Sequence, residues 1–176
     1  MYIWIGCRLP QSFETALRQF CRQANADLQL SEAAFQLPQH ISLKISFDAG
    51  DHWQAVIERL KSWCNAQRPF TVSLQSPQQV PGVLWLPVAE NDTLRKLHRD
   101  LDALLETEFH IPQHPFDKDF RFHSTLFQDS DDKLSQIYPR LADLHFPEPL
   151  EINTFLLGIA QENAPGAYRV TEQITV

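Results

Sequence analysis

Two short stretches of the chain carry the polar side chains best suited to chemistry, and they share one pattern. Each stretch places a histidine two residues before a hydroxyl side chain, His40 before Ser42 and His123 before Thr125. Polar and apolar residues alternate in both stretches, which is typical of strands whose side chains at i and i+2 lie on one face. We therefore predict strands over residues 39–47 and 120–127, with each histidine beside its hydroxyl group.

The two histidines are the candidate catalytic residues. Histidine titrates near pH 6.5, so of two imidazoles that face one another one can be neutral and the other protonated near neutral pH. Such a pair can act as general base and general acid, and each proton transfer typically contributes ~10²–10⁴ in rate. His40 and His123 lie 123 − 40 = 83 positions apart, so they meet only if their strands face each other across a cleft.

Four further side chains on the predicted polar faces are suited to holding a phosphate group. The hydroxyl groups of Ser42 and Thr125 can donate hydrogen bonds to its non-bridging oxygens. Lys44 and Arg121 share the faces of the two histidines and can offset the negative charge. The sequence therefore predicts a phosphate-binding set of Ser42, Thr125, Lys44 and Arg121. No carboxylate cluster indicates a metal site, and we expect neither a metal nor a cofactor.

The elements around these strands occur twice, which predicts an internal duplication. A strand over residues 2–8 and one over 83–88 are each followed by an amphipathic helix, and Trp4 matches Trp85 at an offset of 85 − 4 = 81 positions. We predict an α+β fold of two similar lobes related by a pseudo-twofold axis. Each lobe is expected to hold a mainly antiparallel sheet with helices outside, and the cleft lies between the lobes. Residues 1–176 form one domain of two intertwined lobes, since no linker separates them.

Several element boundaries follow from capping and turn signals. We expect Ser12 to cap the first helix, Asp51 and Gln54 to form a capping box for the second, and Asn91 or Asp92 to cap the third. A fourth helix over 132–144 should be kinked or split at Pro139, because proline removes a helix hydrogen bond. Strands are also expected over 70–74, 150–160 and 168–176, with a turn over 76–82.

Composition narrows the class of partner. The chain has 176 residues, 43% of them hydrophobic, and a formal net charge of −7. This balance gives no basic surface for an extended nucleic acid, so a nucleic-acid substrate should be held at one phosphate or one end. Three widely spaced cysteines predict buried thiols in a reducing cytoplasm. The apolar opening is too short for a signal peptide or a membrane span. We expect a monomer that binds no membrane.

The histidine stretches carry a resemblance to a known family. His40-Ile-Ser-Leu43 and His123-Ser-Thr-Leu126 resemble the duplicated HxTL motif of the 2H phosphoesterase superfamily. In particular the chain is similar to the bacterial RNA 2′,3′-cyclic phosphodiesterases, also named 2′-5′ RNA ligases. The likeness covers nearly the whole chain and includes residues 83–86 and the closing turn from Pro165 to Tyr168.

This resemblance implies a metal-independent phosphoesterase with a central cleft. It would hydrolyse 2′,3′-cyclic phosphate ends of RNA or nucleotides to 2′-phosphates, and 2′-5′ ligation is the reverse reaction. By analogy with the family, His123 would be the base and His40 the acid. Two alternatives stay open. One is a phosphodiesterase acting on another small cyclic nucleotide, such as an ADP-ribose cyclic phosphate, or trimming RNA 3′ ends. The other is a nucleotide-binding module without turnover.

The chain also departs from the family pattern. Ser42 stands where threonine is commoner, and Gln128 stands where many relatives carry arginine, so substrate binding there should be weaker or differently directed. Contacts to the rest of the nucleotide cannot be placed by motif. The candidates for the rim of the cleft are Arg8, His114, Phe116 and Lys118.

Overall fold

The computed structural model describes residues 1–142, 144, 149–164 and 166–176 and has a mixed α+β fold with antiparallel sheets. The larger sheet has the strand order β10 (Arg169–Thr175), β9 (Thr154–Ala160), β1 (Tyr2–Arg8) and β2 (His40–Ser42), and β3 (Phe47–Asp48) also pairs with β1. The second sheet has the order β5 (Gln78–Val80), β6 (Val83–Pro87) and β7 (His123–Gln128). A short pair joins β4 (Phe70–Val72) to β8 (Leu150–Ile152).

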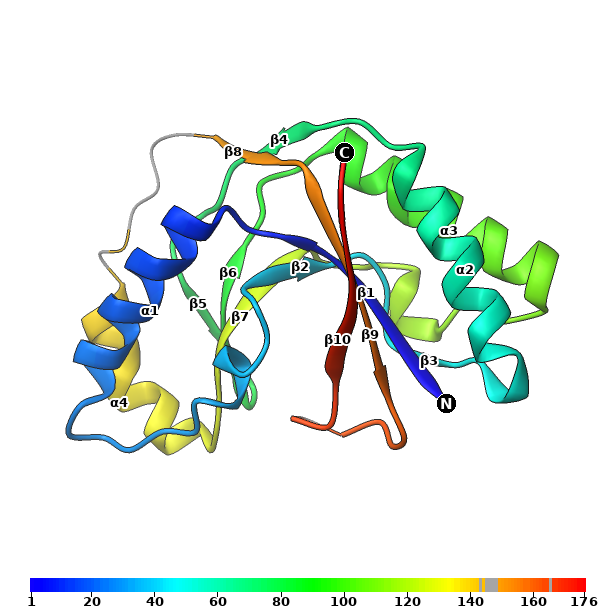
Figure 1. Ribbon diagram of the computed structural model, residues 1–176. Coiled ribbons are helices and arrows are strands. Elements are labelled where there is room, and N and C mark those ends of the chain that lie inside the picture. Colours follow the sequence, from blue (N-terminus) through cyan, green and yellow to red (C-terminus); the bar gives the residue numbers. More distant parts are fainter. Residues whose placement is uncertain (143, 145–148, 165) are drawn as a thin grey trace.

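In the described residues four α-helices flank these sheets, and they lie in two pairs (Figure 1). They are α1 (Gln11–Asn25), α2 (Trp53–Asn65), α3 (Asp92–Phe109) and α4 (Asp131–Leu141). Helix α1 lies beside α4, where Arg140 donates to the carbonyl oxygen of Ala24 at 2.8 Å. On the other side α2 lies beside α3, where Arg59 is paired with Glu108 at 2.8 Å. Each pair takes one helix from each half of the chain, so the two lobes of the duplicated fold are interleaved.

One apolar core joins the helices to the sheets. Every helix carries apolar residues at helical spacing on its inner face, among them Leu17 of α1, Leu60 of α2, Leu101 of α3 and Leu134 of α4, all 3% exposed or less. Burial of each such side chain contributes about 1.5–3 kcal/mol. This core fixes the sheets that carry the histidines. Within the described residues, no helix is both long and apolar enough to span a lipid bilayer.

The histidine strands are shorter than the sequence predicts. Strand β2 ends at Ser42, and the chain then bends because the backbone N–H of Ile45 donates to Oδ1 of Asp117 at 3.1 Å instead of to a strand. In the second lobe β7 begins only at His123. The carbonyl oxygen of Phe120 accepts a hydrogen bond from the Arg95 side chain at 2.6 Å, so this part of the predicted strand lies outside the sheet.

The helix ends confirm one capping prediction and correct two. Asn91 caps α3, since its side chain accepts a hydrogen bond from the N–H of Leu94 at 3.0 Å. Helix α1 begins one residue before Ser12, directly after Pro10, so the predicted serine cap is wrong. The predicted capping box at Asp51 is also wrong, because a 3₁₀ turn (Gly50–His52) runs directly into α2.

The second half of the chain shows three further differences. Helix α4 continues through Pro139 and ends at Leu141, whereas the prediction extends it to residue 144; of that predicted end, residue 143 lies outside the described residues. The predicted turn over 76–82 contains the edge strand β5. The long strand predicted over 150–160 is divided at Asn153, so that β8 pairs with β4 while β9 pairs with β1 and β10.

Candidate active site

The two histidine strands come from different sheets and lie next to each other. The hydroxyl group of Ser124 donates to the side-chain oxygen of Gln39 at 3.0 Å, and both residues are buried. Gln39 directly precedes His40 and Ser124 directly follows His123, so this hydrogen bond joins the two strands beside the histidines. The structure therefore brings together the two stretches that the sequence marks as candidates for chemistry.

Both imidazole rings are held in the same tautomer. Nδ1 of His40 lies 2.7 Å from the carbonyl oxygen of Pro38, and Nδ1 of His123 lies 2.7 Å from that of Arg121. A carbonyl oxygen only accepts hydrogen bonds, so each Nδ1 carries a hydrogen. When the ring is neutral, Nε2 keeps its lone pair and can accept a proton. When it is protonated, Nε2–H can donate one.

A tryptophan ring packs against each imidazole. The ring centroids of Trp4 and His40 are 4.3 Å apart, and those of Trp85 and His123 are 4.1 Å apart. Trp4 also donates its indole N–H to the hydroxyl oxygen of Ser42 at 3.0 Å, so one side chain orients both members of the first motif and leaves the hydroxyl hydrogen free to bind a ligand. The matched Trp4 and Trp85 indicate a repeat in the sequence, but their place beside the histidines follows only from the structure.

Two glycines make room for the Trp4 ring. A Cβ atom added to Gly6 would lie 2.8 Å from the ring, and one added to Gly158 would also lie 2.8 Å from it. Both distances are shorter than a normal carbon–carbon contact, which is ~3.5–4.0 Å. The glycines on β1 and β9 therefore let the indole lie flat against the sheet and reach His40.

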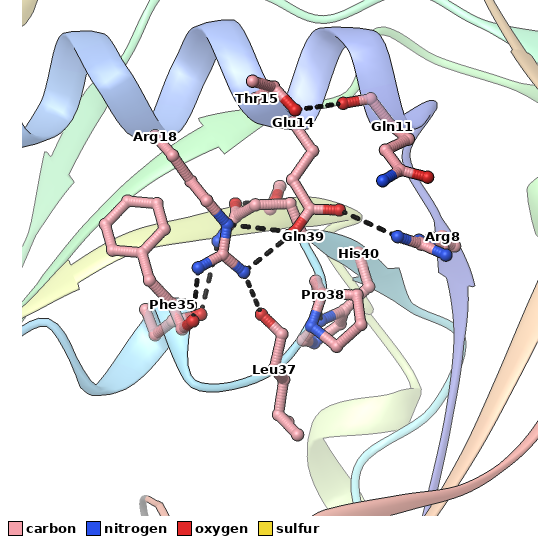
Figure 2. Close-up of polar contacts among 12 residues, drawn as sticks. Arg8, Gln11, Glu14, Thr15, Arg18, Phe35, Leu37, Pro38, Gln39 and His40 are labelled. Atoms are coloured by element: carbon pink, nitrogen blue, oxygen red, sulfur yellow. Dashed lines mark hydrogen bonds and ion pairs between the residues drawn. The ribbon is translucent and has the colours of Figure 1, made fainter.

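A buried carboxylate organises the chain that leads into β2 (Figure 2). Glu14 accepts hydrogen bonds from Nε and Nη2 of Arg18 at 2.9 and 2.8 Å and one from Arg8 at 3.4 Å. Arg18 in turn donates to the backbone carbonyl oxygens of Phe35 and Leu37. Because charge-assisted hydrogen bonds are about twice as strong as neutral ones, this cluster fixes the loop before the first histidine.

Burial favours the neutral form of both histidines in the ligand-free protein. Burial lowers the pKa of His40 to about 4; the carbonyl oxygen of Pro38 and the Glu14 carboxylate oppose this shift, and the charge of His123 adds to it. Burial also lowers the pKa of His123, against the effect of its hydrogen bond to Arg121. A bound phosphodiester carries a negative charge and would raise both pKa values, because it favours the protonated imidazoles.

Five of the six predicted site residues line two neighbouring cavities. His40, Ser42 and Thr125 line the first, which has a volume of about 270 Å³ and is also bordered by Gln128 and Tyr168. Among its described lining residues there is no lysine, arginine, aspartate or glutamate. The second cavity has a volume of about 200 Å³, and its lining includes His123 and Arg121. The two imidazoles are close enough for the charge of His123 to influence the pKa of His40.

Lys44 lies elsewhere, and the prediction that it shares a face with His40 and Ser42 is wrong. Because β2 ends at Ser42, its side chain turns into the protein, where Nζ lies 2.5 Å from Oδ1 of Asp102 and 2.5 Å from Oδ2 of Asp117. The Lys44 side chain is 1% exposed and lines neither cavity. Its charge is already balanced by two carboxylates, and the structure places Lys44 outside the candidate site.

The residues proposed for the rim are not found there. Arg8 is bound to Glu14 and Gln173, and His114 accepts the backbone N–H of Phe116, whose side chain is exposed. Neither these three nor Lys118 lines either cavity.

Tyr168 and Asn163 instead line the first cavity, and they are joined by a hydrogen bond of 2.8 Å from the phenol group to the amide oxygen. The only sequence signal for them is the closing turn, in which Pro165 lies outside the described residues. In the described part of the chain, no three histidine, cysteine or acidic side chains are grouped to hold a metal ion. Independence from metal stays a prediction.

Solved structures with the same fold cover nearly the whole chain. TT0787 of Thermus thermophilus matches with a TM-score of 0.65 and 19% identity, over 99% of this chain and 97% of that one. Escherichia coli LigT, solved in complex with 3′-AMP, matches with a TM-score of 0.58 and 17% identity, over 99% and 96%. Usb1 of Kluyveromyces marxianus matches with a TM-score of 0.57 and 10% identity, also over 99% and 96%.

These identities are low, so the structural likeness shows the fold, and no curated protein matches the chain significantly in sequence. The family is shown by sequence instead. The model of the 2′-5′ RNA ligase superfamily matches residues 10–163, a range that includes both histidine motifs. The chain, with its duplicated lobes and paired histidines, therefore belongs to the 2′-5′ RNA ligase superfamily.

Proposed function

We propose that the protein hydrolyses 2′,3′-cyclic phosphate ends of RNA or nucleotides to 2′-phosphates, without a metal ion, with His40 and His123 as the acid–base pair. Membership of the superfamily supports phosphoesterase- or ligase-type activity on RNA in general. One observation carries the specific proposal. Each imidazole donates Nδ1–H to a carbonyl oxygen two residues earlier, which leaves both Nε2 atoms available for proton transfer.

The proposed step moves two protons and exchanges one bond. A neutral imidazole takes a proton from water while the water oxygen attacks phosphorus. The bond from phosphorus to O3′ breaks, and the protonated imidazole gives its proton to O3′. The product is a 2′-phosphate with a free 3′-hydroxyl group. With a 5′-hydroxyl group in place of water, the same step forms a 2′-5′ linkage, which is ligation.

The remaining site residues would hold the phosphate. Ser42, whose oxygen already accepts the Trp4 N–H, can donate its hydroxyl hydrogen to a non-bridging oxygen. Thr125 lines the same cavity and can donate in the same way. If negative charge grows on the phosphate oxygens that accept these hydrogen bonds, the bonds would stabilise the transition state more than the ground state.

The direction of proton flow is proposed from the resemblance, with His123 as base and His40 as acid. Burial opposes this direction, since it lowers the pKa of His40 to about 4 in the absence of a ligand. Two groups act the other way. The Glu14 carboxylate raises the pKa of His40, and the phosphodiester charge would raise it further. No carboxylate is among the causes that shift the pKa of His123.

The first cavity is suited to the terminal nucleoside. Its volume of about 270 Å³ is just below the ~300–1,000 Å³ that is usual for small-molecule sites, so it would admit one nucleoside rather than a longer segment. The fold relative LigT has been solved with 3′-AMP, which supports a nucleotide as the ligand of this chain.

The test is to incubate the protein, in EDTA, with RNA and with nucleosides that end in a 2′,3′-cyclic phosphate, and to separate the products. We expect 2′-phosphates. A 3′-phosphate product would contradict the proposed bond cleavage. Turnover of an ADP-ribose cyclic phosphate alone would favour that substrate instead. Nucleotide binding without any turnover would indicate a binding module.

A further inference from the structure

We infer that the second cavity, around Arg121, binds the phosphodiester one nucleotide before the cyclic end, so that the protein prefers an RNA end to a free cyclic nucleotide. This inference rests on the proposed function. It assigns one part of the substrate to each cavity: the terminal nucleoside to the first, and the preceding linkage to the second.

The two cavities differ in charge. The first has no lysine, arginine, aspartate or glutamate among its described lining residues. The second is lined by Arg95, Arg121 and Glu90, two cations and one carboxylate, so 2 − 1 leaves an excess of one positive charge. The base and ribose of the terminal nucleoside are neutral, and the hydroxyl groups and imidazoles meet its cyclic phosphate. The linkage before it carries one more negative charge, which matches the second cavity.

The guanidinium group of Arg95 already forms hydrogen bonds within the protein. It donates to Glu90 through Nε at 2.8 Å and through Nη2 at 3.2 Å, and to the carbonyl oxygen of Phe120 through Nη1 at 2.6 Å. Its charge is thereby balanced by the Glu90 carboxylate. Arg95 shapes the wall of the cavity, and the excess positive charge belongs to Arg121.

Arg121 is free to bind an anion. Its side chain is exposed, and the structure records no hydrogen bond or ion pair of its guanidinium group with any described residue. Its backbone oxygen accepts the Nδ1–H of His123 at 2.7 Å, which holds the residue beside the histidine. Guanidinium groups bind phosphate through paired hydrogen bonds, and an exposed one loses little hydration when it does so.

The scissile phosphate would lie elsewhere. It must contact the hydroxyl groups of Ser42 and Thr125 in the first cavity and both imidazoles, and His123 lines the second cavity, so it lies where the two cavities meet. Arg121 lines only the second cavity, and its backbone lies on the Nδ1 side of His123, away from the reacting Nε2, so we assign a second phosphate to its guanidinium group. In the second cavity Gln75 and Gln78 add exposed amide groups, which can bind the sugar or the phosphate oxygens of the same linkage.

The net charge of the chain is consistent with a contact to a single phosphate of the RNA. A net charge of −7 disfavours binding along a strand, so one cation beside the site would provide the attraction. A single phosphate contact to a single strand predicts that log affinity falls with log salt concentration with a slope of about −0.7.

The experiment compares two dinucleotides that both end in a 2′,3′-cyclic phosphate. One has an ordinary phosphodiester linkage and the other an uncharged methylphosphonate linkage. The value of kcat/KM is measured for each with the wild type, Arg121→Gln and the control Arg68→Gln, which removes one charge from an exposed arginine that lines neither cavity. Thermal melting confirms that the variants are folded.

We expect the wild type to prefer the charged linkage by about tenfold, the effect of one charge-assisted hydrogen-bonded contact. Arg121→Gln should reduce the ratio of the two kcat/KM values nearly to one, and Arg68→Gln should leave this ratio unchanged. A wild type without preference, a preference that survives in Arg121→Gln, or an equal loss in both variants would each overturn the inference. Failure to turn over any cyclic substrate would instead overturn the proposed function. Equilibrium binding of the two product dinucleotides, which needs no turnover, then decides the inference by the same comparison.

Discussion

Ser124 and Gln39 form a buried hydrogen bond of 3.0 Å that joins the two histidine strands. Each of the two residues is the direct neighbour of a histidine, Gln39 of His40 and Ser124 of His123. The bond therefore connects two sheets at the point where the imidazoles must be placed relative to one another. A small displacement of one strand would change the geometry of both proposed proton transfers.

Ser124→Ala tests this connection. It leaves the Gln39 side-chain oxygen buried without its Ser124 partner, so we expect a loss of about 1–3 kcal/mol in the free energy of unfolding. We also expect kcat to fall more than KM rises, because both imidazoles remain but lose their relative position. Denaturant unfolding and steady-state kinetics measure the two effects. Ser62→Ala removes an exposed hydroxyl group from α2 and serves as the control. Unchanged kcat in a destabilised Ser124→Ala protein would show that the bond only stabilises the fold.

Gly158→Ala tests the support of His40 by Trp4. The added methyl group would lie 2.8 Å from the indole ring, so the ring must move, and with it the contact to His40 and the hydrogen bond to Ser42. We expect turnover of a cyclic nucleotide to fall by at least tenfold in a protein that still folds. In a Trp4→Phe background the smaller ring leaves room for the methyl group, so Gly158→Ala should reduce turnover by a smaller factor there. An equal reduction of turnover in both backgrounds would show that Gly158→Ala does not act through Trp4.

The pH dependence of kcat/KM follows from the two lowered pKa values. This parameter reports groups of the free enzyme, and activity needs one neutral and one protonated imidazole. The pKa of His40 is about 4 and that of His123 is also below 6.5. Below the lower pKa the base is protonated, and above the higher pKa the acid has lost its proton. We therefore expect a bell-shaped profile with its maximum below pH 6.5. A maximum above pH 6.5 would show that burial does not control these groups in solution.

A substrate with sulfur in place of the 3′-bridging oxygen tests which histidine is the acid. A thiolate leaves without protonation, so the loss of the acid should matter little for this substrate, whereas the loss of the base should matter fully. With His40 as the acid, we expect His40→Ala to recover most of its turnover on the sulfur substrate and His123→Ala to stay inactive. The opposite result would exchange the two roles.

Much of this architecture is predictable because its signals are local or repeated. The alternation around His40 and His123 predicts strands, and the matched spacing of Trp4 and Trp85 predicts the duplication. The α+β fold with antiparallel sheets and two lobes is confirmed. Both histidines occupy equivalent places in it, on neighbouring strands with the same tautomer.

The errors come from contacts between residues that are distant in sequence. Lys44 continues the alternation of its strand, but Asp102 and Asp117 draw it into the interior, and nothing within the strand indicates this. The role of Tyr168 depends on how the closing segment folds over the first cavity. The division of the site into two cavities likewise depends on which elements pack together, and the sequence alone does not show that Arg121 and Thr125 line different ones.

The most direct test of the central claim measures turnover of the nucleoside 2′,3′-cyclic monophosphates, with EDTA present, by the wild type, His40→Ala, His123→Ala and the double variant. His52→Ala, which removes an exposed histidine outside both cavities, is the control. We predict that each single substitution at the site lowers kcat by ~10²–10⁴ and that the double variant is little worse than either, because the two imidazoles act as one unit. Full activity in either single variant would contradict the two-histidine mechanism.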